Sequence, residues 1–143
     1  MRCNCGEFSA DLRDGWVDTT DATSPFTLSK QPDGVGALQF SIARYTGGGL
    51  PTINTSALVE MLHEFVEGNS QASAESMVQE DGDLRLAAGS FSLDDQTFAR
   101  AWYVSDGTNV AKVTYVCAKQ DVGSELAEAE RIVRSIRFEH HGT

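Results

Sequence analysis

The segment from Phe98 to Phe138 constrains the fold more than any other part of the sequence. It contains two runs rich in β-branched and aromatic residues, at 98–104 and 110–117, which are typical of strands. Asp106-Gly107 lies between them and favours the positive φ angles of a tight hairpin. Apolar residues at helical spacing follow: Leu126, Ala129, Ile132, Val133 and Ile136. A hairpin followed by an amphipathic helix predicts an α+β core.

The rest of the chain carries shorter patterns of the same two kinds. Alternating apolar and polar residues predict strands at 8–12, 16–17, 26–30, 37–45, 74–79 and 84–93. A first helix is expected from Thr55 to Glu67, with Leu58, Met61, Leu62 and Phe65 buried and Glu60, Glu64 and Glu67 in solvent. The second helix is expected to begin near Ser124, with acidic residues in its first half and arginines in its second, as the helix dipole favours.

These elements predict one domain over residues 1–143. Its fold class is α+β, with a twisted antiparallel β-sheet of about six to seven strands packed with two main α-helices. The strand at 98–104 has apolar residues on both faces, as in a central strand covered on both sides, although Arg100 lies among them. The expected core contains Phe40, Leu58, Leu62, Phe65, Trp102, Val113, Tyr115, Val133 and Ile136.

Composition narrows the classes of function. The formal net charge is −10, with 21 acidic and 11 basic residues, which argues against binding to nucleic acid or to an anionic membrane surface. The same charge fits either solubility alone or a basic protein partner. No apolar run approaches the roughly 20 residues of a membrane span, and the first residues do not resemble a secretory signal. An odd count of three cysteines suits a reducing compartment, so we expect a cytoplasmic protein.

The order of these patterns resembles the Mog1/PsbP-like fold, which includes many small bacterial proteins. The matching segments are Phe8 with Asp14-Gly15-Trp16, a long strand ending in Arg44-Tyr45 before a Gly-rich loop, the 113–117 strand, and the segment 132–138. The resemblance implies an antiparallel sheet with helices against its faces. Such domains mostly work as binding or accessory proteins, among them photosystem assembly factors, a regulator of a nuclear GTPase, chaperones and immunity-type proteins. It implies no catalytic residues and no cofactor.

The residues that could carry chemistry have simpler interpretations. Cys3 and Cys5 supply two soft ligands where a closed zinc site needs four, so two free thiols on a frayed terminus are expected. Cys117 ends a core strand and is expected to pack as a small apolar side chain. His63 falls on the polar side of the first helix, and no serine or cysteine has evident histidine and carboxylate partners. We therefore expect no enzymatic activity and no metal site.

Loop residues are the candidates for contact with a partner. A flexible Gly-rich loop is formed by Gly47, Gly48 and Gly49, and carboxylates cluster in two further loops, at Asp81 with Asp83 and at Asp94 with Asp95. We expect these loops to share one end of the sheet and to bind a basic protein. The leading hypothesis is an immunity protein that neutralises a co-encoded toxin. The alternatives are a dedicated chaperone for a secreted effector and a small-ligand-binding domain with a pocket between sheet and helix.

Overall fold

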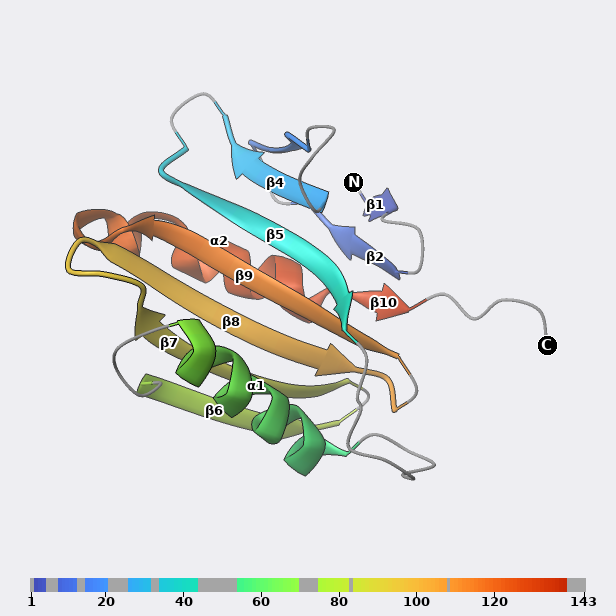
Figure 1. Ribbon diagram of the computed structural model, residues 1–143. Helices are drawn as coiled ribbons and strands as arrows, with labels where there is room; N and C mark the ends of the chain where they lie inside the picture. The colour runs from blue at the N-terminus through green and yellow to red at the C-terminus, as the bar shows by residue number, and fades with distance from the viewer. Residues whose placement is uncertain are drawn as a thin grey trace.

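A seven-stranded antiparallel sheet forms the centre of the computed structural model (Figure 1). Its strand order is β3-β4-β5-β9-β8-β7-β6. The strands are β3 (Trp16–Asp18), β4 (Phe26–Lys30), β5 (Gly36–Ala43), β6 (Glu75–Asp81), β7 (Arg85–Ser92), β8 (Thr97–Ser105) and β9 (Val110–Ala118). The structure describes residues 2–4, 8–12, 15–20, 26–31, 34–43, 54–69, 75–82, 84–107 and 109–138. The predicted α+β class and antiparallel sheet are confirmed.

The hairpin of β8 and β9 lies in the middle of this sheet, as the sequence predicts. The two strands pair from Thr97 with Ala118 to Ser105 with Val110. In the turn, Gly107 has a φ of 104°, and its backbone N–H donates to the Ser105 hydroxyl at 2.9 Å. Residues with a Cβ rarely adopt that φ, so a glycine after Asp106 is well suited to this turn.

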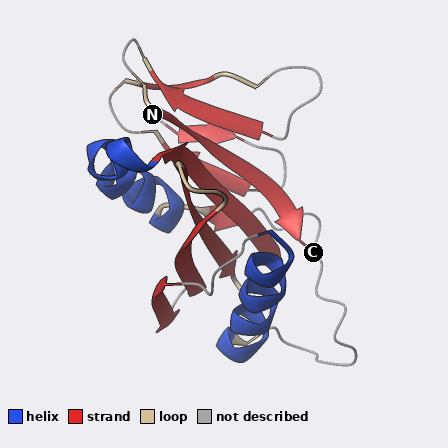
Figure 2. Cartoon of the chain, turned by 60° about the vertical axis from the view of Figure 1, so that its left-hand side comes forward, coloured by secondary structure: helices blue, strands red, loops and turns tan. Residues whose placement is uncertain are grey.

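Two helices cover opposite faces of the sheet (Figures 1 and 2). α1 (Thr55–Asn69) packs on β6, β7 and β8, whereas α2 (Val122–Arg134) packs on β8, β9 and β2 after a short 3-10 turn at Lys119–Asp121. Because side chains alternate along a strand, Ala101 and Tyr103 of β8 join the cluster under α1, and Trp102 joins the cluster under α2. Both faces of β8 are therefore buried.

A second, three-stranded sheet has the order β1-β2-β10, with β1 at Arg2–Asn4, β2 at Phe8–Asp11 and β10 at Arg137–Phe138. The predicted strand at Phe8 belongs to this sheet and not to the large one. The expectation of a frayed N-terminus is also wrong for residues 2–4, because Cys3 pairs with Ala10 in the ladder. β1 has three residues and β10 has two, which is too few to show an alternation of apolar and polar residues.

The buried residues match the predicted core except at Phe65. Phe40, Leu58, Leu62, Trp102, Val113, Tyr115, Val133 and Ile136 are all fully buried. On α1 the residue that continues from Leu58 and Leu62 at i+4 spacing is Val66, which is buried, whereas Phe65 is half-buried on the flank of the helix. Its ring meets Phe91 edge to face at 5.8 Å. Trp16 is buried as well.

We predict that Trp102→Ala lowers the free energy of unfolding by about 3–5 kcal/mol, because it leaves a large cavity beneath α2. The matched control is Val17→Ala, since Val17 is 41% exposed and its truncation should change stability by no more than about 0.5 kcal/mol. Chemical denaturation followed by fluorescence or circular dichroism measures both. Equal losses for the two variants would contradict the assigned core.

Candidate functional site

Three glutamates of α2 contact the sheet, and the first of them, Glu125, is buried. One carboxylate oxygen accepts a hydrogen bond from the Tyr115 hydroxyl at 2.9 Å, and the other accepts from the backbone N–H of Val35 at 3.0 Å. From the sequence alone, Glu125 is one of the acidic residues in the first half of the helix that suit the helix dipole. Its hydrogen bonds instead fasten the first turn of α2 to β9 and to the segment before β5.

Gly36 provides the space for the Tyr115 phenol. A Cβ at this position would lie 2.6 Å from the Tyr115 Cζ and hydroxyl and 2.6 Å from the Val116 carbonyl oxygen. Carbon atoms cannot approach that closely, so any larger residue would displace Tyr115 or β5. Burial and the Glu125 carboxylate raise the pKa of Tyr115, so its hydroxyl keeps the proton that it donates.

Glu128 contacts the β3–β4 hairpin. It accepts a hydrogen bond from the Trp16 indole N–H at 3.3 Å and forms an ion pair with Lys30 at 2.5 Å. The carboxylate raises the pKa of Lys30. Trp16 is buried while Lys30 is partly exposed. The Glu128 carboxylate therefore provides a hydrogen-bond acceptor for the buried Trp16 indole and a counter-charge for Lys30 near the solvent.

Glu130 explains the arginine among the apolar residues of β8. Arg100 is 6% exposed, and its guanidinium donates to Glu130 at 2.8 Å and to the Ser90 hydroxyl at 2.9 Å. The same guanidinium lies 5.5 Å from the centre of the Trp102 ring, within the range of a cation–π contact. A charge at this depth is tolerated because it is paired and hydrogen-bonded.

Arg134 extends this group of charges to the edge of the sheet. It forms ion pairs with Glu130 at 3.4 Å and with Glu80 of β6 at 2.5 Å. The Glu130–Arg134 pair has the i,i+4 spacing of a stabilising helix pair. Arg134 also lowers the pKa of Glu80 through its hydrogen bond. These contacts hold α2 to the sheet, so they contribute to the stability of the fold.

The described loop carboxylates, Asp81, Asp94 and Asp95, do not lie at one end of the sheet. Asp81 lies at the β6–β7 turn, before β7, and Asp94 with Asp95 lies after β7. Successive turns of an antiparallel meander alternate between the two ends of a sheet, and eight residues of β7 separate these turns by roughly 25 Å. The expectation that both acidic loops share one end is therefore wrong. Gly47, Gly48, Gly49 and Asp83 lie outside the described residues.

The described loop carboxylates are exposed. Asp81 lies 3.6 Å from Arg85, an i,i+4 ion pair at the turn. Asp94 accepts the backbone N–H of Gln96 at 2.8 Å, and hydrogen bonds to this backbone and to Thr97 lower its pKa. Asp95 is exposed beside it. Asp94 therefore has a structural role in its turn, and contact of any of these residues with a partner stays a prediction.

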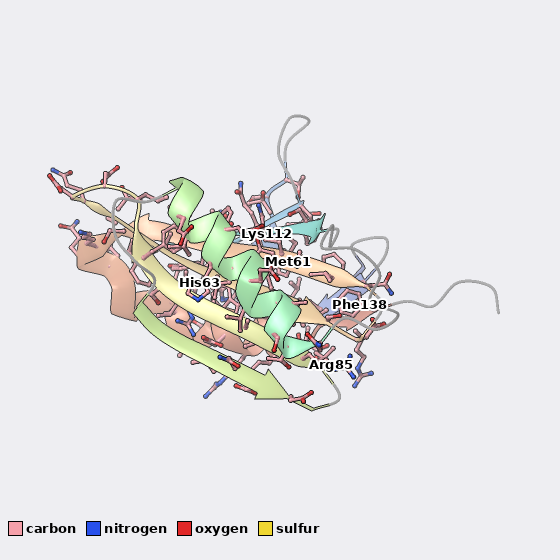
Figure 3. The ribbon with its side chains drawn as sticks, turned by 60° about the horizontal axis from the view of Figure 1, so that its bottom comes forward. Met61, His63, Arg85, Lys112 and Phe138 are labelled. Carbon is pink, nitrogen blue, oxygen red and sulfur yellow. The ribbon has the colours of Figure 1, made fainter. Side chains whose placement is uncertain are left out.

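A different acidic surface lies on α1. Its outward residues include Glu60, Glu64 and Glu67, which are exposed, as the sequence predicts. His63 on the same helix is exposed too (Figure 3). The helix has no basic residue in its last turn and no acidic residue in its first. Burial, with a smaller contribution from Glu64, raises the pKa of Tyr103 beneath this helix to about 12.

The residues considered as metal ligands are partly accounted for. Cys117 is a free, buried thiol whose pKa is raised by burial, so the prediction that it packs as a small apolar side chain is confirmed. Cys5 and His140-His141 lie outside the described residues. Across the part of the chain that the structure describes, no group of three or more His, Cys, Asp and Glu residues is placed to hold a metal ion. In the same part, no helix is long and apolar enough to cross a membrane.

The sheet covered by helices on both faces, with a small sheet beside it, defines the fold class. No known protein family and no curated protein matches the sequence. The solution structure of cyanobacterial PsbP (CyanoP) from Synechocystis sp. PCC 6803 matches with a TM-score of 0.63 and 12% identity, over 93% of this chain and 87% of that one. The chain therefore has the PsbP/Mog1-like fold that the sequence resemblance implied.

A second structure, from Bacteroides thetaiotaomicron VPI-5482, matches with a TM-score of 0.61 and 18% identity. The match covers 96% of this chain and only 47% of that one, so this chain spans about half the length of the Bacteroides protein. At these identities the two matches establish the fold alone.

We predict that Glu130→Gln lowers the free energy of unfolding by about 2–4 kcal/mol, because it leaves the buried Arg100 charge without its anionic partner. Arg134→Ala is the matched control, since it removes a cation from the same group at an exposed position and should cost no more than about 1 kcal/mol. Urea denaturation at neutral pH measures both. A larger cost for Arg134→Ala than for Glu130→Gln would contradict the assigned roles.

The raised pKa of Tyr103 predicts a specific alkaline destabilisation. The unfolded chain ionises this tyrosine near pH 10 and the folded chain only near pH 12, so stability is lost as pH rises through that window. Tyr103→Phe removes this loss. Between pH 8 and pH 11, wild type should lose about 1.4 kcal/mol more than Tyr103→Phe. Equal losses in urea denaturation at the two pH values would show that Tyr103 ionises normally.

Proposed function

We propose that this chain is a protein-binding domain without catalytic activity, and that its partner is a protein with a basic surface. The observation that supports this proposal is the charge arrangement of α1. Its exposed face carries Glu60, Glu64 and Glu67, and it lies over β6, β7 and β8 on the side of the sheet opposite α2. A net charge of −10 adds a long-range attraction for basic proteins and a repulsion of nucleic acid.

The arrangement on α1 is unfavourable for the isolated helix. Glu60 and Glu64 are like charges at i,i+4 spacing, which repel each other. Glu67 lies in the last turn, where the helix dipole favours cations. α2 shows the opposite arrangement, with Glu125 in its first turn and arginines in its last. A basic partner over α1 would relieve this repulsion, so the charge arrangement favours binding of a basic protein.

The specific role that we propose is that of a cytoplasmic immunity protein, which covers and neutralises a co-encoded toxin. A dedicated chaperone for a secreted effector is the alternative, because it also binds one protein without catalysis. The genes next to the coding sequence separate the two. A neighbouring toxin gene supports immunity, whereas a secretion-effector operon supports the chaperone.

We predict that the double variant Glu64→Lys/Glu67→Lys captures at least tenfold less partner than wild type in pull-downs from the native cell. The reversal replaces attraction by repulsion on α1, and binding by wild type should fall between about 50 mM and about 0.5 M salt as charges are screened. The variant should unfold at the same or a higher temperature than wild type, because Glu67→Lys places a cation at the helix C-terminus.

The matched control is Asp95→Lys, compared with the single variant Glu64→Lys, because it makes the same change in net charge beyond the far end of β7 from Asp81 and keeps the hydrogen bonds of Asp94 in its turn. If α1 is the contact surface, this control should bind within about twofold of wild type. Full retention of the partner by the α1 variant, or recovery of nucleic acid in its place, would refute the proposal. Loss of the partner in both variants would place the second acidic loop in the interface as well.

A further inference from the structure

β6 is an outer strand of the large sheet (Figures 1 and 3). In the part of the chain that the structure describes, it pairs with β7 alone. The pairing is regular from Val78 to Asp81, and a register shift precedes Val78. An outer strand presents backbone N–H and C=O groups that another strand can pair with.

The alternation of hydrogen-bonded pairs along β7 shows which backbone groups of β6 point to the open edge. Leu93 donates its N–H to the Thr97 carbonyl at 3.0 Å across the β7–β8 connection. In an antiparallel ladder, hydrogen-bonded pairs alternate with pairs that are not bonded, so the odd-numbered residues of β7 bond to β8. The even-numbered residues Leu86 and Ala88 therefore direct their backbone groups towards β6.

The same alternation of hydrogen-bonded pairs holds between β7 and β6. The residues opposite Leu86 and Ala88 are even-numbered, and Gly82, which donates to the Leu84 carbonyl at 3.3 Å, continues that series. Gln79 and Asp81 therefore direct their N–H and C=O groups away from β7, towards the open edge. Both residues are exposed.

Charge decides which strand fits this edge. The sequence of β6, Glu-Ser-Met-Val-Gln-Glu-Asp, contains acidic residues and no basic one. A second copy of the chain would bring like charges into opposite positions, which destabilises a strand pair. A strand with lysine or arginine at alternate positions would instead bring opposite charges within about 5 Å of Glu80 or Asp81.

Gln79 and Asp81 of the open edge lie on the face of the sheet that α1 covers. Gln79 pairs with Ala87, which belongs to the apolar cluster under α1, and Asp81 is on the same side of β6. Glu80 is on the α2 side, where Arg134 already pairs with it. Asp81 lies 3.6 Å from Arg85, but its side chain is still 77% exposed, so it is the carboxylate that a strand on this edge would meet on the α1 side.

We propose that β6 binds an extended basic segment of the partner protein as an additional antiparallel strand, through the backbone groups of Gln79 and Asp81. This inference rests on the proposed function, because it assigns the contact surface of the same basic partner. The two additional pairs would join the partner's backbone to the large sheet, and α1 would lie beside the basic side chains of the added strand.

Amide hydrogen exchange of the full chain, measured residue by residue by NMR, tests the proposal. The probe is the peptide acetyl-Lys-Val-Lys-Val-Lys-Val-Lys-amide, and its charge-matched control replaces each valine by proline, which prevents strand pairing. In the free protein the amides of Val78 and Glu80 should be protected and those of Gln79 and Asp81 unprotected. The valine peptide at saturation should slow exchange at Gln79 and Asp81 at least tenfold, and the proline peptide should not.

Asp81→Lys should weaken binding of the valine peptide at least fivefold without loss of the fold, since Asp81 is exposed. Equal binding of the two peptides, with no protection at Gln79 and Asp81, would overturn the strand pairing. Protection of these amides at high protein concentration without peptide would overturn it in favour of a second copy. The pull-down with the α1 variant reports on the basic partner separately, so a salt-sensitive partner without protection at β6 would refute this inference alone.

Discussion

The structure depends on burial of the β8–β9 hairpin from both sides. Ala101 and Tyr103 need cover on one face and Trp102 needs it on the other, so helices must pack on both faces of the sheet. A strand in that position has no solvent-exposed side for a polar residue. Arg100 on β8 can therefore exist only with internal partners, and it finds them in Glu130 of α2 and Ser90 of β7. The contact of Glu130 with the sheet follows from this requirement.

The hairpin, both helices and most of the core could be predicted from the sequence, because their signals are local. Period-two and period-3.6 patterns with turn residues between them need no knowledge of distant segments. β1 and β10 could not be predicted this way, because each is very short. In addition, β10 pairs with β2 from a distant part of the chain, as Phe138 does with Phe8. The resemblance to the PsbP/Mog1-like fold did not identify these strands.

The charged residues were predicted less well, although two signals were present. Glu125 is four residues before Ala129 and eight before Val133, so it continues the apolar stripe of α2 and had to be buried with partners. The strand predicted at 84–93 separates the two acidic loops, so their opposite placement also follows from the order of elements. The partners of Arg100 and Glu125 lie on other elements, and no local sequence pattern predicts them.

The small sheet has a consequence for the order in which the chain can fold. During synthesis β2 is made before all strands of the large sheet, whereas β10 is made after every other described strand. Phe8 can contact Phe40, at a ring separation of 5.7 Å, as soon as β5 has been made. Its contact with Phe138 forms only after β10 has been made. Until then one side of β2 has no strand beside it. The nascent chain therefore leaves this edge of β2 open until β10 has been made, and pairing of β10 with β2 closes it.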